Sequence, residues 1–136
     1  MERSETLPLS DDDRLAMLAA AREAITYRAD LKSSSVKPEL RPADFAANFD
    51  TSLPDKGASA TSVIDDLIEV ASKGLQGHAS SRFFGYVCGG SMPVGTAADF
   101  LVTSWGQNAA SSWESPSVAV IEQTVCRWCL ELLGLP

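Results

Sequence analysis

The sequence has little basic charge, few cysteines and a single histidine, and each shortage narrows the class of protein. Eleven Lys and Arg stand against eighteen Asp and Glu, so the net charge of −7 would repel the phosphates of a nucleic acid. The three cysteines are too few, and odd in number, for a disulfide framework. His78 is the only histidine, which excludes a metal site built from several histidines. We therefore expect no nucleic-acid partner and reduced thiols.

Long hydrophobic runs are also missing. The longest uncharged stretches, residues 83–98 and 100–113, contain Gly, Ser, Pro, Gln or Asn, so no membrane span is predicted. Residues 1–13 lack the basic and apolar regions of a signal peptide, and we expect a cytoplasmic protein. A length of 136 residues fits one domain with a core but is short for a two-lobed cofactor enzyme.

Charge is scarce in the second half of the chain. Residues 1–68 hold thirteen acidic and eight basic side chains, whereas residues 69–136 hold five and three. A half with so few charges must be mostly covered from water, and a chain of this size offers limited cover. The charge distribution therefore predicts either a partner or a place in a larger protein.

Capping residues and helical spacing predict a long first helix followed by an extended arm. Ser10 precedes an acidic run that suits a helix N-terminus, and the helix is expected to reach about residue 31. Prolines make residues 36–57 an extended arm, with a short turn near residues 43–47. One apolar face of the first helix is predicted to carry Leu15, Leu18 and Ile25.

Three more helices and one short strand are expected beyond the arm. The second helix covers residues 59–72, and the aromatic stretch 82–88 reads as a strand. Ser91 is expected to cap a third helix that continues to about residue 107. Ser115-Pro116 starts the fourth, whose apolar residues step by three and four: Val118, Ile121, Val125, Trp128 and Leu132.

Two kinds of site can be considered from the residues alone. Cys126 and Cys129 could form a zinc site with His78 and Cys88, or they could be small semi-buried thiols beside Trp128. Both cysteines fall in the middle of a predicted helix, so we favour the second interpretation and expect no metal. The four lysines are Lys32, Lys37, Lys56 and Lys73. They lie in polar or loop-like surroundings, which do not favour imine chemistry. The residues alone therefore provide no complete catalytic set.

Several motifs together resemble the amino-terminal region of group II pyridoxal-phosphate-dependent decarboxylases, the relatives of aromatic-amino-acid and glutamate decarboxylases. The resemblance covers nearly the whole chain and includes the leading helix and the arm. Its motifs are Phe49-Asp50, Leu53-Pro54, His78 with Arg82-Phe83-Phe84-Gly85, Met92-Pro93, Ala98-Asp99, Ser115-Pro116, Glu122, and Trp128 with Leu132 to Pro136.

The resemblance implies a mainly α fold, the helical amino-terminal segment of a type I fold pyridoxal-phosphate enzyme, with one short strand and an extended arm. It divides the chain into a leading helix and arm, 1–58, and a helical segment, 59–136, that leads into a large cofactor domain. In the family the cofactor lysine follows a histidine in a Ser-x-His-Lys-like motif, which does not occur here. The chain thus resembles a segment truncated before the cofactor domain, with no catalytic residue and no covalently bound pyridoxal phosphate of its own.

The resemblance also carries two groups of pocket residues. Tyr86, Val87 and Cys88 correspond to a loop that lines the substrate side of the active site. The stretch from Asn108 through Ala109 to Ser111 corresponds to one that reaches into the active site of the partner subunit. Its small residues, where members acting on aromatic substrates carry bulkier ones, count against an aromatic substrate.

The implied function is to form the homodimer and complete the pocket of an amino acid decarboxylase, which removes the α-carboxylate of a substrate held by the cofactor as an imine. The alternative is a non-catalytic helical module for oligomerisation or interaction, because the chain lacks the imine-forming lysine.

Overall fold

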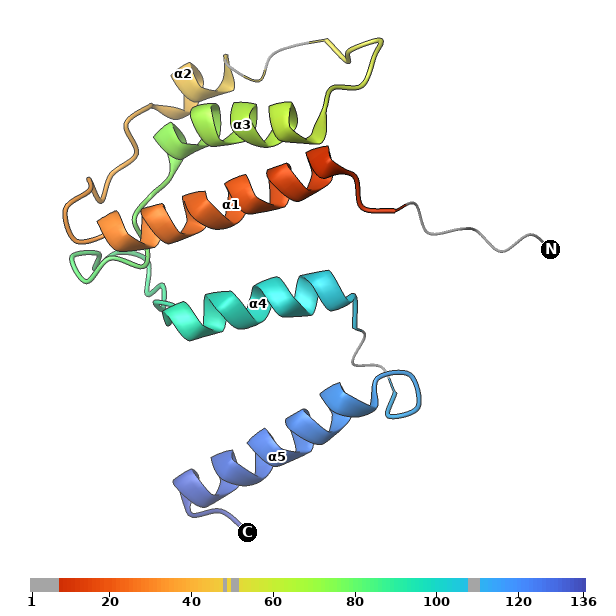
Figure 1. The fold of residues 1–136 in the computed structure, drawn as a ribbon. Coiled ribbons are helices and arrows are strands. Elements are labelled where there is room, and N and C mark those ends of the chain that lie inside the picture. The colour runs from red at the N-terminus through yellow and green to blue at the C-terminus, as the bar shows by residue number, and fades with distance from the viewer. Residues whose placement is uncertain (1–7, 48, 50–51, 108–110) are drawn as a thin grey trace. The chain divides into compact units, whose positions relative to one another are not determined.

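The computed structural model describes residues 8–47, 49, 52–107 and 111–136. The chain divides into two compact units, Met1–Gly90 and Ser91–Pro136, and each is described by itself. The first contains α1, α2 and α3, and the second contains α4 and α5 (Figure 1). Their bounds are α1 Asp11–Asp30, α2 Pro42–Ala46, α3 Ala60–Ala71 with the 3₁₀ turn η1 Ser72–Gly74, α4 Pro93–Trp105 and α5 Pro116–Leu133.

The start of α1 follows from its first four residues. The Ser10 hydroxyl accepts a hydrogen bond from the Asp13 amide at 3.0 Å, and the Asp13 carboxylate accepts one from the Ser10 amide at 3.1 Å. This reciprocal capping box satisfies two amides at the helix end, and the acidic run complements the positive end of the helix dipole. The predicted cap and helix are confirmed.

Small side chains allow α1 to pack against α3. Ala16 is buried, and Ala20 lines the same hollow between the two helices with Met17, Val63 and Ile64. The apolar residues expected on one face of α1, Leu15, Leu18 and Ile25, are exposed in the structure. The alanine-rich face lies against α3 instead, where small side chains permit a closer approach of the helices.

Asp12 joins the two helices by capping α3 from α1. Its carboxylate accepts hydrogen bonds from the Ala60 amide at 2.6 Å, the Thr61 hydroxyl at 2.6 Å and the Thr61 amide at 3.3 Å. The Thr61 hydroxyl lowers the pKa of the Asp12 carboxyl; desolvation opposes this, and the two backbone amides add to the lowering. Ser59, the N-cap of α3, accepts a further hydrogen bond from the Ser62 amide.

The arm is held against η1 and the segment that follows it. The Glu39 and Leu40 amides donate to the Lys73 carbonyl oxygen, and the Gly77 amide donates to the Val36 carbonyl oxygen. Gly74 lies under the Phe45 ring, where an added Cβ would come within 2.6 Å of a ring carbon. The short helix α2, which carries Phe45, confirms the predicted turn.

The predicted start of the third helix was off by one residue. Met92, not Ser91, occupies the N-cap position of α4, and no side-chain hydrogen bond caps the helix there. Pro93 fixes the first turn because it needs no hydrogen-bond acceptor for its nitrogen. Gly106 and Gly134 end α4 and α5 with φ of 58° and 64°, left-handed conformations that glycine adopts without a Cβ penalty.

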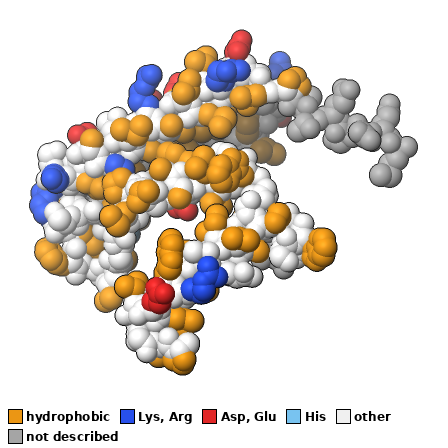
Figure 2. All heavy atoms as spheres, turned by 60° about the horizontal axis from the view of Figure 1, so that its bottom comes forward, with side chains coloured by type: hydrophobic (Ala, Val, Ile, Leu, Met, Phe, Trp, Pro, Cys, Tyr) orange, Lys and Arg blue, Asp and Glu red, His pale blue; other side chains and the backbone are white. Residues whose placement is uncertain are grey.

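Few described side chains are buried. In the described ranges only Ala16, Gly77, Ser80 and Ser115 are buried, and the apolar residues of α4 and α5 are largely exposed. Figure 2 shows hydrophobic side chains at the surface over much of the face it presents. The sequence-based division after residue 58 also differs from the structural one, because α3 packs on α1 and the units divide after Gly90.

Candidate functional site

The expected strand at residues 82–88 was wrong. These residues form turns, and no strand occurs in the described parts of the chain. Tyr86 and Val87 have φ of 57° and 55°, which is incompatible with the extended backbone of a strand. The aromatic alternation that suggested a strand is instead used to pack rings within a turn.

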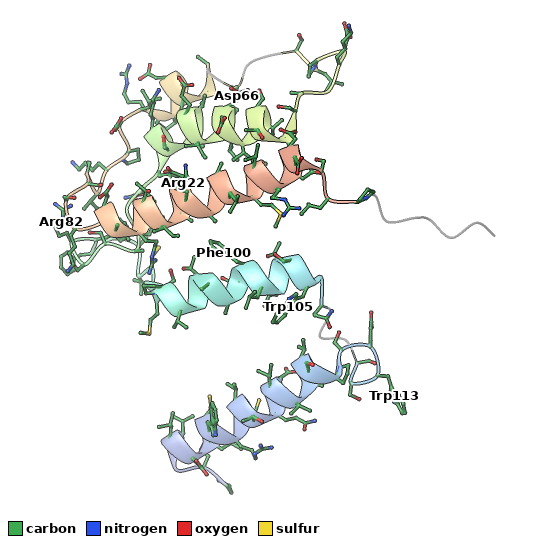
Figure 3. The ribbon with its side chains drawn as sticks, in the orientation of Figure 1. Arg22, Asp66, Arg82, Phe100, Trp105 and Trp113 are labelled. Atoms are coloured by element: carbon green, nitrogen blue, oxygen red, sulfur yellow. The ribbon has the colours of Figure 1, made fainter. Side chains whose placement is uncertain are left out.

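Hydrogen bonds attach this turn to the end of α1. The Ser80 hydroxyl donates to the Leu31 carbonyl oxygen at 3.1 Å and accepts from the Arg82 amide at 3.3 Å. The Arg82 guanidinium donates to the Ser34 carbonyl oxygen. Figure 3 shows Arg82 beside the C-terminal end of α1. The turn is therefore attached to one carbonyl group at the C-cap of α1, Leu31, and to one in the segment that follows the helix, Ser34.

Three aromatic side chains connect the attached part of the turn to its exposed end. The His78 and Phe83 rings meet edge to face at a centroid distance of 4.8 Å, and the Phe83 and Tyr86 centroids are 6.3 Å apart. A Cβ added to Gly85 would approach the Phe83 ring to 3.1 Å, so the backbone itself lies against that ring. Phe83 is thus the central packing residue of the turn.

The turn holds Tyr86 and Val87 in a strained conformation without burying them. Tyr86 is 82% exposed and Val87 is 103% exposed. A non-glycine residue with positive φ costs on the order of 1–3 kcal/mol, and a β-branched residue such as valine is a pronounced outlier there. Such strain is found mainly at binding and catalytic sites, where surrounding contacts maintain it.

Two of the three residues expected to line the substrate pocket are therefore the strained ones, and Cys88 follows them directly. The Cys88 sulfur lies 3.9 Å from the Tyr86 carbonyl oxygen, and its thiol is exposed. This turn presents a phenol, an apolar side chain and a thiol on consecutive residues. It can contact and orient a small molecule, but it contains no acid–base pair.

The second group of expected pocket residues is only partly described. Asn108 and Ala109 lie outside the described residues. Ser111 is exposed, and its hydroxyl accepts hydrogen bonds from the Trp113 and Glu114 amides, both at 3.2 Å. These bonds shape the turn that leads into α5, so the Ser111 hydroxyl is engaged as an acceptor by its own loop.

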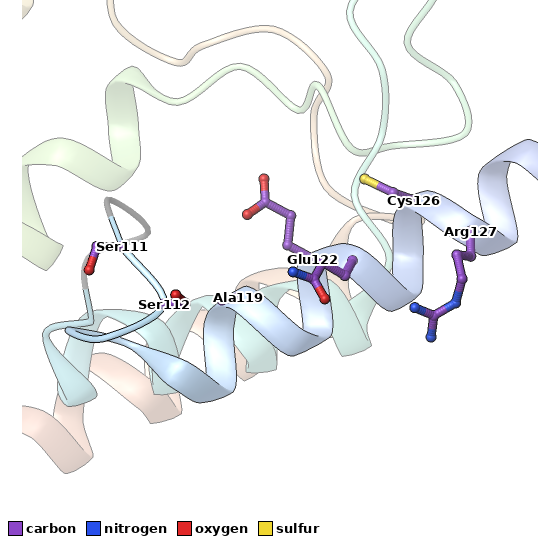
Figure 4. Close-up of a pocket in the computed structure, with 7 residues that line it drawn as sticks. Ser111, Ser112, Ala119, Glu122, Cys126 and Arg127 are labelled. Atoms are coloured by element: carbon purple, nitrogen blue, oxygen red, sulfur yellow. The ribbon is translucent and has the colours of Figure 1, made fainter.

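Two depressions stand out among the described residues of the second unit. One, between α4 and α5, is predominantly apolar and is lined by Val102, Trp105, Gln107, Ser117, Val118 and Ile121. The other lies beside α5, near Ser111 and Ser112, where Glu122 and Arg127 point in different directions (Figure 4). Because these opposite charges diverge, the second depression does not form a converging polar site.

No described residues gather into a metal centre. Groups of three or more His, Cys, Asp or Glu side chains suited to a metal ion are absent from the described ranges. Cys126 and Cys129 are exposed, so the expected semi-buried packing beside Trp128 was wrong. Most of α5 is exposed within its own unit, and the Cys126 and Cys129 thiols therefore reach solvent.

The lysines do not provide an attachment site for pyridoxal phosphate. All four lysines lie in the described part of the chain and are exposed: Lys32, Lys37, Lys56 and Lys73. An imine-forming lysine needs a desolvated setting. Covalent attachment of the cofactor does not fit the residues of this chain.

Some of the residues that shape the site carry little signal in the sequence. Ser80 and Arg82 act across 48 or 49 residues on carbonyl oxygens near the end of α1, and backbone acceptors have no side-chain signature. The Arg82-Phe83-Phe84-Gly85 motif did mark the segment, though as a strand. Asp12, in the acidic first turn of α1, was expected to complement the dipole of its own helix, and its carboxylate also caps α3.

No helix within the described residues is long and apolar enough to cross a membrane.

The fold of the chain is similar to that of a known protein structure. Neither a family model nor a curated protein matches the chain. Among solved structures, the chain has the fold of a helical segment of a pyridoxal-phosphate-dependent decarboxylase. The mainly helical fold class expected from the sequence is confirmed, apart from the strand.

The similar structure is the crystal structure of Oryza sativa TDC with PLP and tryptamine, a plant tryptophan decarboxylase. The TM-score is 0.79 at 22% sequence identity, and the match covers 96% of this chain. The chain spans 27% of the length of that protein.

Proposed function

We propose that the chain is the amino-terminal, dimer-forming and pocket-completing part of a group II pyridoxal-phosphate-dependent amino acid decarboxylase of the cytoplasm. The observation that carries the proposal is the fold: 96% of the chain matches a segment of the plant tryptophan decarboxylase structure with a TM-score of 0.79. The motifs named in the sequence support the same family independently of the fold.

The turn at Tyr86, Val87 and Cys88 is the part proposed to contact the amino acid substrate. Its three residues are exposed, and Tyr86 and Val87 have an uncommon left-handed backbone conformation. A backbone that is ordered before binding can present side chains to a substrate at a lower cost in conformational entropy. Asn108, Ala109 and Ser111 are proposed to enter the pocket of the partner subunit.

The cofactor would be held by residues outside this chain. Pyridoxal phosphate supplies an electron sink for the loss of an α-carboxylate. The exposed lysines here do not fit that attachment, so the contribution of the chain is contact with the substrate, orientation and exclusion of water.

A homodimer is the proposed cover for the apolar surface of the second unit. Trp105 is 63% exposed, and the neighbouring Val102 and Ile121 line the same apolar depression. Exposed apolar surface of this kind commonly marks an interface, and a standard one buries about 800 Å² on each partner.

The second candidate function is a non-catalytic module for helical association, and the exposure of all four lysines is the observation that favours it. The DNA that follows the codon of Pro136 separates the two. The decarboxylase proposal predicts an open frame that encodes a Ser-x-His-Lys-like motif. A frame without such a motif would favour the interaction module.

A further inference from the structure

The part of the fold that supports the proposed substrate turn is a buried serine and an exposed arginine. Ser80 is 7% exposed, and its hydroxyl acts twice, as donor to the Leu31 carbonyl oxygen and as acceptor for the Arg82 amide. The side chain of Arg82 then reaches the Ser34 carbonyl oxygen. Both residues therefore connect the turn to the segment that ends α1.

The strain in the turn requires such a support. Tyr86 and Val87 hold left-handed φ although both side chains are exposed, so their own packing does not explain the conformation. A strained backbone persists only where neighbouring structure determines it. The nearest structure is Phe83, whose ring lies against Gly85 and near Tyr86.

Phe83 is in turn placed by the serine. Its amide donates to the Ser80 carbonyl oxygen at 3.0 Å, directly after the residue whose amide donates to the Ser80 hydroxyl. A continuous set of contacts thus runs from the end of α1 through Ser80 to Phe83 and on to Tyr86. All of it lies within the first unit.

We propose that Ser80 and Arg82 are positioning residues that hold the Tyr86–Cys88 turn in its substrate-contacting conformation by attaching it to the end of α1. This inference rests on the proposed function for the role of the turn, but not for the attachment itself. Neither residue touches the substrate. The turn's geometry then depends on α1, and the position of that helix sets the position of the pocket side chains.

Fluorine NMR of the full chain labelled with 3-fluorotyrosine tests the attachment. The chain has two tyrosines, Tyr27 in α1 and Tyr86 in the turn, so one resonance reports on the turn and the other on the helix. Ser80→Ala should move or broaden the Tyr86 resonance and leave that of Tyr27 in place. The adjacent exposed serine provides the matched control, and Ser81→Ala should move neither resonance.

Amide hydrogen exchange measures how much the attachment is weakened. Variants at a second, exposed position keep the test decisive if Ser80→Ala fails to fold. Ser80→Ala removes the acceptor of the Arg82 amide, whose exchange should speed up about tenfold, the effect of one lost hydrogen bond. At the exposed position, Arg82→Gln should move the Tyr86 resonance, and Arg82→Lys, which keeps a charged donor, should restore it. A Tyr86 resonance that stays in place in both Ser80→Ala and Arg82→Gln, or that moves only together with Tyr27, overturns the proposal.

These readouts require neither cofactor nor substrate. An open frame without the cofactor lysine would contradict the proposed function but not the proposed attachment of the turn. An unmoved Tyr86 resonance would contradict the attachment but not the decarboxylase proposal.

Discussion

Replacement of Val87 by glycine should stabilise the first unit, which is unusual for a mutation to glycine. Val87 has φ of 55° and is fully exposed, so it loses no burial when its side chain is removed. A left-handed conformation costs an L-residue about 1–2 kcal/mol, and glycine does not bear that cost. Glycine loses about 0.5–1 kcal/mol through the greater freedom of the unfolded chain. From the middle of each range, the net gain is about 0.75 kcal/mol in the free energy of unfolding.

Thermal unfolding of the full chain, followed by far-ultraviolet circular dichroism, measures this gain. A change of 1 kcal/mol shifts Tm by about 4–8 °C in a unit of this size, so Val87→Gly should raise Tm by about 3–6 °C. The matched control is Leu53→Gly, at a loop residue that is 93% exposed and does not have positive φ. That control should lower Tm. If Val87→Gly lowers Tm as much as Leu53→Gly does, the turn is not strained and the support argument loses its basis.

Three further outcomes follow from the same structure. The folded-state pKa of Asp12 is lowered, so the stability that its carboxylate contributes is present above its unfolded pKa of about 3.9 and is lost as pH falls through the lower folded value. In an acid titration of folding stability, the Asp12→Ala variant should lack this loss, and the control variant Asp11→Ala should retain it. The isolated chain mixed with pyridoxal phosphate should give no stoichiometric imine band in its visible spectrum, because its lysines are exposed; a band abolished by one Lys→Ala change would contradict this. Sedimentation equilibrium should show a dimer that Trp105→Glu shifts toward monomer or aggregate and Gln123→Glu does not, and a stable monomer of the unmodified chain at high micromolar concentration would remove the dimer proposal.

The helices could be predicted from the sequence because their signals are local. Ser10, Ser59 and Pro116 mark starts and Gly134 marks an end, and the structure places the helix termini at or beside these residues. Caps and breakers act within one turn of a helix, so a single sequence contains the required information.

The turn and the packing faces could not be predicted in the same way. Phe83, Phe84 and Tyr86 alternate as strand residues do, but left-handed backbone at Tyr86 and Val87 overrides that preference. The hydrogen bonds that support the turn join residues 48 or 49 positions apart. The face of α1 that packs on α3 does not follow from hydrophobicity either, since Leu15 and Leu18 are exposed whereas Ala16 is buried.

Decarboxylation by the product of the complete reading frame tests the central claim most directly. The frame that includes codons 1–136 would be expressed, loaded with pyridoxal phosphate and assayed for release of carbon dioxide from each of the standard amino acids. The account predicts release that depends on pyridoxal phosphate and is lost when residues 1–136 are deleted and restored when they are supplied. A product that releases no carbon dioxide from any of them, or that keeps full activity after the deletion, would contradict it.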